Sequence, residues 1–194
     1  MKTIFLSSIR MFLALTALAG VLYPVVVTLV SATLFPHEAK GSLVYHKSVV
    51  VGSELIAQPA PDASYFDPRP SAGDYGTVPS GASNLAITGR VLQELIRTRA
   101  SKWGKSVQDI PPDLLFSSGS GLDPHISPQA AYFQVSRIAR ARGLSEPQIA
   151  GLERLIAEHI ETPQWGIWGE PRVNVLLLNC KIDTMKEFAP VIGK

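Results

Sequence analysis

The sequence predicts one small α+β domain that follows a single N-terminal transmembrane helix. The chain has 194 residues and one cysteine, a length that suits one ordinary domain plus an additional segment. That segment is the uncharged run from Met11 to Phe35, which exceeds the roughly 20 residues that cross a bilayer as a helix. After it, two stretches typical of strands flank three typical of helices, an order found in α+β domains.

The charge balance after this run argues against a nucleic-acid partner. The chain has 18 basic and 16 acidic residues, and Lys2 and Arg10 precede the run. The rest of the chain therefore has no net charge, whereas nucleic-acid binding needs a concentrated basic face. A single cysteine also excludes a disulfide framework within the chain.

We interpret residues 11–35 as an uncleaved transmembrane helix. Ala17-Leu18-Ala19 resembles the cleavage site of a secretory signal peptide, which is the alternative. The apolar run continues for 16 residues beyond Ala19. A spanning helix needs that continuation, and a cleaved signal does not.

The flanking charges predict the orientation of the helix. Lys2 and Arg10 lie on its N-terminal side, and basic residues near a span favour the cytoplasmic side. A long following domain can be translocated regardless of its charge. We therefore expect a single-pass protein of the cell inner membrane, with residues 1–10 in the cytoplasm and an external domain, residues 36–194, in the periplasm.

One face of the predicted helix carries small residues. At about 100° per residue they fall within a sector of about 120°, opposite a face of leucine and valine. Small residues are common in membrane helices, but they also let neighbouring helices approach closely, so we expect this stripe to bind a partner helix. Pro24 leaves the Gly20 carbonyl without its intrahelical donor, which predicts a kink or a partner contact. The stripe consists of Ala14, Ala17, Gly20, Pro24, Thr28 and Ser31.

The domain begins with predicted strands and a long irregular loop. Residues 43–58 are rich in Val, Leu and Ile with a break at Gly52-Ser53, as expected for one or two strands. Residues 59–83 contain five prolines and three glycines, with no helical or strand period. The loop is too long for a simple connector and keeps Tyr65 and Phe66, which a disordered linker would usually lack. We expect an ordered, packed loop that provides a contact surface.

Two helices are predicted next. Residues 85–102 have apolar positions at a helical period, and a second irregular stretch, residues 108–124, follows. Ser127 is suited to cap the second helix, with Pro128 at its first position. Gly143 is suited to end it in a left-handed conformation.

A third helix and a strand complete the predicted domain. Ser145 and Gln148 form a capping box at the start of the helix, and Pro163 should end it at the preceding residue. The nearly continuous apolar run from Val173 to Cys180 has the length of a strand and predicts a central one.

The segment around Ser120 permits a hydrolase hypothesis. Ser120 would be the nucleophile and His125 the base, with Asp123 close by. The segment lacks the Gly-x-Ser-x-Gly pattern, because Ser118 takes the place of the first glycine, and a triad depends on spatial geometry. We interpret it as a glycine-rich turn before a capped helix, and we expect no catalytic residue.

Metal and phosphate sites are not predicted either. Asp123 with His125, or His37 with Glu38, would supply only two ligands, and neither pair belongs to a Cys/His cluster of familiar spacing. No Walker-type phosphate loop is present in the sequence. Cys180 is interpreted as a small core residue. Four further basic residues could form a cluster that binds an anionic ligand, but we interpret them as a solvated helix face: Arg137, Arg140, Arg142 and Arg154.

Several sequence blocks follow one another in a fixed order along the chain. The most specific are Ser118–Pro128, Arg137–Gly143 and Gly169–Val175, and the others are Leu34–His37, Val51–Ile56, Tyr65–Phe66, Arg69–Ala72 and Ser80–Leu85. With these blocks and one membrane helix, the chain resembles the C subunit of the bacterial Kdp-type potassium-transporting ATPase over nearly its whole length.

The resemblance implies a complex with a channel-like potassium-translocating subunit and a P-type subunit that hydrolyses ATP. It implies that the C subunit is held in the membrane lipid and on the channel-like subunit by its helix, while the complex handles ATP and potassium. The family is described as raising the ATP affinity of the pump subunit. A domain outside the cell cannot contact cytoplasmic nucleotide, so this effect should be transmitted through the assembly.

We therefore expect a non-catalytic accessory subunit of ATP-driven potassium uptake, without a cofactor of its own. An anchored serine hydrolase outside the cytoplasm and a purely structural assembly factor are the alternatives. The loops at residues 59–83 and 117–128 are expected near the outer mouth of the potassium path. Their candidate contact residues are Tyr65, Phe66, Arg69, Ser120, Asp123 and His125.

Overall fold

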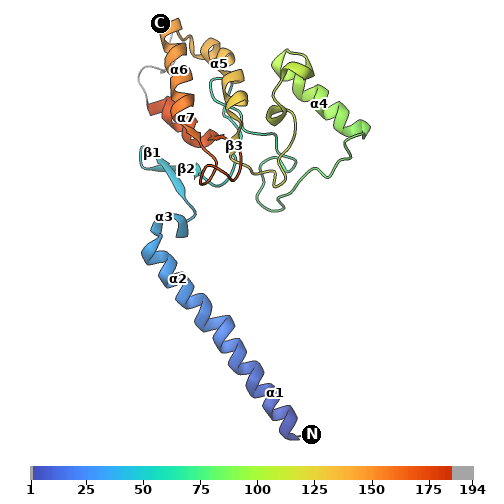
Figure 1. Cartoon of the computed structure of the whole chain (residues 1–194), viewed down its shortest axis with the longest axis vertical. Helices are drawn as coiled ribbons and strands as arrows, with labels where there is room; N and C mark the ends of the chain where they lie inside the picture. Colours follow the sequence, from blue (N-terminus) through green and yellow to red (C-terminus); the bar gives the residue numbers. More distant parts are fainter. Residues whose placement is uncertain (1, 185–194) are drawn as a thin grey trace. The chain divides into compact units, whose positions relative to one another are not determined.

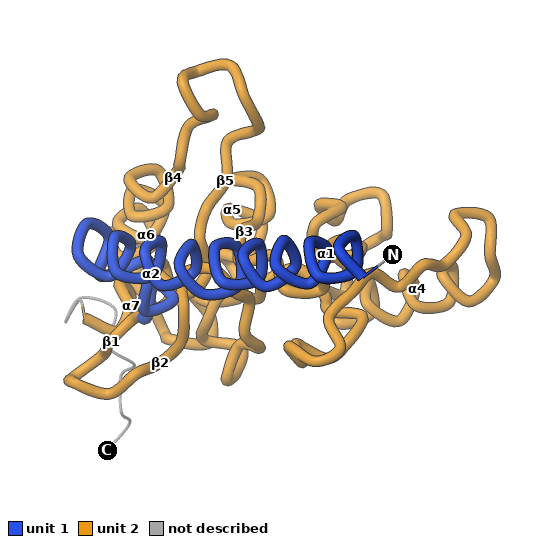
Figure 2. Tube along the Cα trace, turned by 90° about the horizontal axis from the view of Figure 1, so that it is seen from below, with its two compact units in different colours: residues 1–43 blue, residues 44–194 orange. Residues whose placement is uncertain are grey.

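The computed structural model describes residues 2–184. The chain divides into two compact units, residues 1–43 and residues 44–194 (Figure 2). The first unit is helical throughout most of its length. Its elements are α1 (Lys2–Leu15), a π-helical segment η1 (Thr16–Leu22), α2 (Tyr23–Leu34) and the short α3 (Pro36–Ala39).

The first three of these elements form one continuous helix from Lys2 to Leu34 (Figure 1). Within residues 2–184 it is the one helix long and apolar enough to cross a bilayer. Its 33 residues amount to about 50 Å at the usual rise, more than the roughly 30 Å of a hydrocarbon core. The helix thus begins nine residues before Met11, so residues 2–10, expected to precede the helix, are part of it.

The π-helical segment lies immediately before Pro24. Proline has no N–H to donate, which disrupts the usual hydrogen-bond ladder. Here the Tyr23 N–H donates to the Leu18 carbonyl, five residues back, a pattern that widens the turn. The period of 3.6 residues that defined the small-residue stripe therefore does not hold across Thr16–Leu22, and the stripe stays a prediction.

The second unit begins with a β-hairpin of β1 (Leu43–His46) and β2 (Val49–Ser53). Its turn is Lys47-Ser48, with φ values of 49° and 66°, the left-handed backbone that two-residue hairpin turns require. One or two strands were predicted here and two are present, but the predicted break at Gly52-Ser53 is wrong because both residues lie within β2.

No helix or strand occurs between Ser53 and Arg90, which includes the predicted loop, residues 59–83. Residues 54–58 and 85–89, expected in a strand and in a helix, are irregular as well. Helix α4 (Arg90–Trp103) follows, and it ends at Gly104, whose φ of 60° is left-handed. The second irregular stretch contains two short 3₁₀ turns, η2 (Val107–Asp109) and η3 (Pro112–Leu114).

Helices α5 (Pro128–Arg142) and α6 (Glu146–Glu158) begin and end largely as their capping residues predict. The Ser127 side chain accepts a hydrogen bond from Ala130 N–H, and Gly143 has a φ of 65°. Ser145 and Gln148 form the capping box of α6. Helix α6 ends at Glu158, before the expected Thr162, because strand β4 (Ile160–Glu161) follows directly.

A three-stranded antiparallel sheet joins distant parts of the second unit. Its order is β3 (His125–Ile126), β5 (Arg172–Asn174) and β4. Val173 of β5 pairs with Ile126 on one side and Ile160 on the other. The connection between β4 and β5, residues 162–171, extends away from the helices of its unit as an arm (Figure 2).

The prediction of a strand from Val173 to Cys180 is wrong. Only Arg172–Asn174 is a strand, and α7 (Val175–Thr184) follows at once. The Asn174 side chain accepts a hydrogen bond from Leu177 N–H at 3.2 Å, as an N-cap residue does. The buried residues of α7 are Val175, Leu178 and Ile182, at helical rather than strand spacing.

The core of the second unit lies among α5, α6, α7 and the sheet, where Figure 1 shows the three helices close together. The structure confirms the predicted α+β fold class with an N-terminal apolar helix. The largest fully buried side chains of the core come from seven segments of the chain: Phe66, Leu115, Ile126, Ile138, Leu152, Ile156, Val173, Leu178 and Ile182.

Candidate functional site

A polar cleft of about 420 Å³ lies where the sheet meets the loops of the second unit. It brings together three of the predicted contact residues from two distant loops, and adds charged side chains that sequence analysis did not single out. The charged and titratable lining consists of Arg69, Asp113, Asp123, His125, Glu170 and Arg172.

Opposite charges alternate along one wall of the cleft. Arg69 Nη1 lies 3.3 Å from Asp123 Oδ2, and Arg69 Nε lies 4.0 Å from Asp113 Oδ1. The longer distance is an ion pair but not a hydrogen bond, and Arg69 Nε is buried without a hydrogen-bond partner among the described residues. The arginine thus connects η3 with the segment before β3.

His125 lies next to this series of charges, on strand β3 of the sheet. Its Nδ1 lies 3.4 Å from Asp123 Oδ1, and its Nε2 lies 3.8 Å from Glu161 Oε1. Glu161 in turn accepts a hydrogen bond from Arg172 Nε at 2.9 Å. Both nitrogens of the imidazole therefore face carboxylates of the same chain.

Asp123 is a cleft carboxylate whose ionised form the fold favours. Burial alone would raise its pKa, but hydrogen bonds from the His125 side chain and main chain, with the charge of Arg69, lower the pKa below its usual value. A lowered pKa means that the folded state favours the ionised carboxylate. Asp123 therefore stabilises the fold at neutral pH, and this contribution is lost as the pH falls through its folded pKa.

Local hydrogen bonds fix the cleft to helix α5. Asp123 Oδ1 accepts from His125 N–H at 3.0 Å, and Asp113 Oδ2 accepts from Ser127 N–H at 2.7 Å. Ser127 is the N-cap of α5, so the two carboxylates that hold Arg69 also define how the chain enters this helix.

Ser120 lies outside the cleft on an exposed turn. Its Oγ accepts a hydrogen bond from Leu122 N–H at 3.1 Å. His125, the base of the hydrolase hypothesis, faces Asp123 and Glu161 instead. The predicted turn before a capped helix matches this arrangement.

The loop of residues 59–83, here called the clamped loop, is held by amide side chains of two helices. Phe66 N–H donates to Asn179 Oδ1 at 2.8 Å, while Asn179 Nδ2 donates to the Phe66 carbonyl at 3.0 Å. Gln134 makes the same pair of bonds with Asp67. These bonds satisfy buried main-chain groups that a loop cannot pair with itself.

Two arginines of α5 complete the clamp. Arg137 donates to the carbonyls of Ala63 and Tyr65, and Arg142 donates to the Ser64 carbonyl at 2.8 Å. Arg142 is 3% exposed. The prediction that these two arginines belong to a solvated face is therefore wrong, although it fits the exposed Arg140 and Arg154.

The clamp places the predicted contact residues Tyr65 and Phe66 differently from one another. Phe66 is fully buried in the core. The Tyr65 hydroxyl donates to Asp183 Oδ2 at 2.8 Å, and the guanidinium of Arg142 lies 4.9 Å from the centre of the Tyr65 ring. Farther along the loop, burial raises the pKa of Tyr75 to about 12. Both tyrosines therefore pack against the domain itself.

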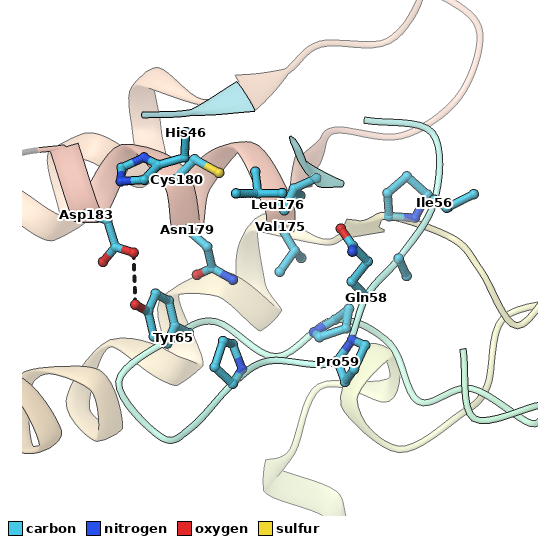
Figure 3. Close-up of a pocket in the computed structure, with 15 residues that line it drawn as sticks. His46, Ile56, Gln58, Pro59, Tyr65, Val175, Leu176, Asn179, Cys180 and Asp183 are labelled. Atoms are coloured by element: carbon cyan, nitrogen blue, oxygen red, sulfur yellow. Dashed lines mark hydrogen bonds between the residues drawn. The ribbon is translucent and has the colours of Figure 1, made fainter. Parts of the chain in front are cut away.

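An apolar cavity of about 370 Å³ is lined in part by residues of the clamped loop. Figure 3 shows Tyr65, Asn179 and Leu176 around it, with Cys180 beside His46. Burial, and then the charge of Asp183, raises the pKa of the Cys180 thiol, which disfavours the reactive thiolate. Cys180 is half-buried at the edge of this cavity and is a helix residue, not the strand residue expected.

Only part of the cleft and of the clamp is evident from the sequence. Arg69, Asp123 and His125 were candidates, whereas six other charged or amide residues were missed: Asp113, Glu161, Glu170, Arg172, Gln134 and Asn179. A signal was available for the amides, because Gln134 and Asn179 interrupt apolar stretches of α5 and α7. The carboxylates offered none, since their partners are distant in the sequence.

Comparison with known proteins gives a match over nearly the whole chain. Residues 5–184 match the family described as K⁺-transporting ATPase, c chain. A protein named potassium-transporting ATPase KdpC subunit from Shewanella putrefaciens is 48% identical over 185 residues, which cover 93% of this chain and 92% of the relative. Relatives of the same name from Leptospira interrogans and Polynucleobacter asymbioticus are 47% and 46% identical, over 91% and 94% of this chain and 92% and 99% of their own.

Proposed function

The chain belongs to the family of the K⁺-transporting ATPase c chain, and from this premise we propose that it is a non-catalytic accessory subunit that anchors to the channel-like subunit and supports ATP-coupled potassium uptake. The match over residues 5–184 carries the proposal. The matched residues include both the apolar helix and the domain, so the family has both parts in one chain.

The helix serves as the anchor in this proposal. Its apolar side chains are exposed throughout α1 and α2, which suits a segment surrounded by lipid and by another helix. The proposed contact is the small-residue stripe, with Gly20 near its centre. A Cβ added at Gly20 would meet only the Thr16 methyl group, at an ordinary 3.8 Å. Packing within the helix therefore does not require a glycine at this position. This supports the proposal that a neighbouring helix packs against Gly20.

The domain acts in this proposal as a rigid platform on the periplasmic side. Arg69 and Asp123 of the cleft form an ion pair, and His125 lies against Asp123, so in this proposal the platform shapes access to the potassium path without binding an ion strongly. An effect on the ATP affinity of the pump subunit would pass through the channel-like subunit, because the domain and the nucleotide lie on opposite sides of the membrane.

The positions of Ser120 and His125 support this proposal over a serine hydrolase. The Ser120 hydroxyl closes its own turn, and the imidazole lies between two carboxylates. In the intact complex, Ser120→Ala should leave potassium-dependent ATPase activity unchanged. Loss of that activity, or labelling of Ser120 by a serine-directed phosphonate, would favour the hydrolase.

Substitution of Gly20 tests the anchor. We expect Gly20→Leu to reduce copurification with the channel-like subunit from detergent-solubilised membranes, because a leucine would hold the two helices apart. Ala19→Leu is the matched control, since its side chain points to another face of the same turn and should leave copurification intact. Equal recovery of both variants would remove the stripe from the proposal.

Removal of the domain separates an active accessory role from a purely structural one. A complex assembled with the helix alone should hydrolyse ATP with weaker potassium dependence or a raised KM for ATP. If the potassium dependence and the KM for ATP were both unchanged in such a complex, the chain would act only as an assembly factor.

A further inference from the structure

The connection between β4 and β5, residues 162–171, is here called the aromatic hairpin. Figure 2 shows it extending away from the helices of its unit. Near its tip, Trp165, Ile167 and Trp168 are 89%, 79% and 66% exposed. Large apolar side chains gathered in this way are unfavourable in water, and such patches mark surfaces that bind another protein or a membrane.

The hairpin is preformed by its own main chain. Gln164 N–H donates to the Trp168 carbonyl at 2.9 Å, and Trp168 N–H donates back to the Gln164 carbonyl at 3.0 Å. Gly166 N–H donates to the Pro163 carbonyl at 2.9 Å. Because these polar groups are paired internally, the tip can leave water at a low desolvation cost.

Backbone strain accompanies this arrangement. Trp165 has a φ of 53°, a left-handed conformation that is unusual for a bulky side chain and costs on the order of 1 kcal/mol. The main-chain hydrogen bonds of the hairpin lie on both sides of this residue, and its ring is exposed.

The short connection between the apolar helix and the domain favours a lipid surface as the binding partner of the aromatic hairpin. Nine residues, 35–43, separate the apolar helix from the domain, and even fully extended they would reach only about 30 Å. A domain with this connection stays near the bilayer at all times. Tryptophan is enriched at the membrane–water interface, where its ring is buried among headgroups and its N–H stays hydrated.

The charge distribution of the hairpin is also consistent with binding to a lipid surface. Residues 162–169 contain no charged side chain, and the nearest carboxylates, Glu161 and Glu170, lie at the base. The tip can therefore enter the interface without burying a charge. Without Lys or Arg in this segment, the attraction should not depend on anionic lipid.

We propose that the aromatic hairpin inserts Trp165, Ile167 and Trp168 into the interfacial layer of the bilayer. This gives the domain a second membrane contact besides its helix and limits its rotation about the connection. The inference rests on the membrane anchor of the proposed function. A concave pocket on another subunit is the competing occupant.

Quenching by brominated lipid tests the insertion. The full chain is reconstituted in phosphatidylcholine vesicles that carry bromine high on the acyl chains, and tryptophan fluorescence is measured. We expect strong quenching of the native chain and loss of most of that quenching in Trp165→Phe/Trp168→Phe, in which Trp103 is the one remaining tryptophan. Equal quenching of the two proteins would overturn the insertion.

A matched control places a tryptophan at another exposed apolar position. Ile87, on the loop before α4, is 84% exposed, so Ile87→Trp in the double-variant background should add fluorescence that the lipid does not quench. Quenching of this residue equal to that of the hairpin would mean nonspecific contact and would also contradict the proposal. The native quenching should be the same in zwitterionic and anionic vesicles.

Two further outcomes separate this inference from the proposed anchor and from a protein partner. A chain that fails to float with the vesicles contradicts the anchor itself, whereas a chain that floats without hairpin quenching contradicts only the insertion. If the other subunits shield Trp165 and Trp168 from aqueous acrylamide and bromine does not quench them, a protein covers the hairpin and the lipid proposal is wrong.

Discussion

The clamped loop and the aromatic hairpin have similar compositions but opposite relations to the core. Both are irregular and combine proline, glycine and aromatic residues. Phe66 of the clamped loop is fully buried, whereas Trp165 of the hairpin is 89% exposed. Aromatic residues in an irregular segment thus predict order, but they do not predict whether the segment faces the protein or its surroundings.

The partners of the main chain account for this difference. The main chain of the clamped loop is paired at Phe66 and Asp67 by side chains of other elements, Asn179 of α7 and Gln134 of α5. The aromatic hairpin pairs Gln164 with Trp168 across its own stem. A segment that satisfies itself can leave the core, and one that depends on other elements is fixed to them.

The largest expected effect is the loss of the buried aromatic anchor. Phe66→Ala should lower the free energy of unfolding by about 3–5 kcal/mol, because it removes core contacts and leaves a cavity. Urea denaturation of the full chain in detergent, followed by circular dichroism, measures this change. Val78→Ala lies on the same loop at a 92% exposed position and should change stability by less than about 0.5 kcal/mol. Similar losses in both variants would show that the loop is not clamped through Phe66.

The second effect concerns the buried arginine of the clamp. Arg142→Ala should cost about 3 kcal/mol, because the variant removes the ion-pair partner of Asp183 and a hydrogen-bond donor to the Ser64 carbonyl. Arg140→Ala removes the same charge from the same helix at an exposed position and is the control. A thermal unfolding midpoint that falls equally in both variants would assign the effect to net charge instead of to the clamp.

The third effect is smaller because Asp123, in the polar cleft, is 33% exposed. Asp123→Asn should lower stability at pH 7 by about 1 kcal/mol, a value reduced by solvent screening. The lowered pKa of Asp123 means that its stabilisation is complete above its unfolded value of about 3.9. The difference between native and variant chains should therefore shrink as the pH falls below about 4.

Denaturation curves from pH 7 to pH 3 measure this dependence. The exposed Asp109→Asn is the control and should show little difference at any pH. A difference between native protein and Asp123→Asn that grows towards acid pH would reverse the sign of the proposed linkage.

Local chemistry made part of the fold predictable. The caps of α5 and α6 depend on residues within a few positions of the helix ends, so Ser127, Gly143 and Ser145 indicated those ends correctly. The run after Val173 was misinterpreted because its high apolar content suited a buried strand. The N-cap Asn174 instead starts a helix at this point. Its side-chain Nδ2 also donates to the Glu54 carbonyl at 2.8 Å, and these two residues are 120 positions apart in the sequence.

The cleft and the clamp were less predictable because their partners are distant in the sequence. Arg137 and Arg142 have the spacing of ordinary surface residues on a helix, and only the loop that covers them makes them buried. Likewise, Glu161 becomes a partner of His125 only once β5 has paired with both β3 and β4. Periodicity reports which face of an element is apolar, and it does not report which polar residues another segment will cover.

The smallest expected effect is at the tip of the aromatic hairpin. Trp165→Gly should change the free energy of unfolding in detergent by less than about 0.5 kcal/mol, because two effects offset one another. Glycine adopts the left-handed conformation of this position without strain, but it also gives the unfolded chain more freedom. The exposed ring contributes few core contacts that could be lost. A loss above about 1 kcal/mol would mean that Trp165 packs on its own domain, and the contrast between the hairpin and the clamped loop would then disappear.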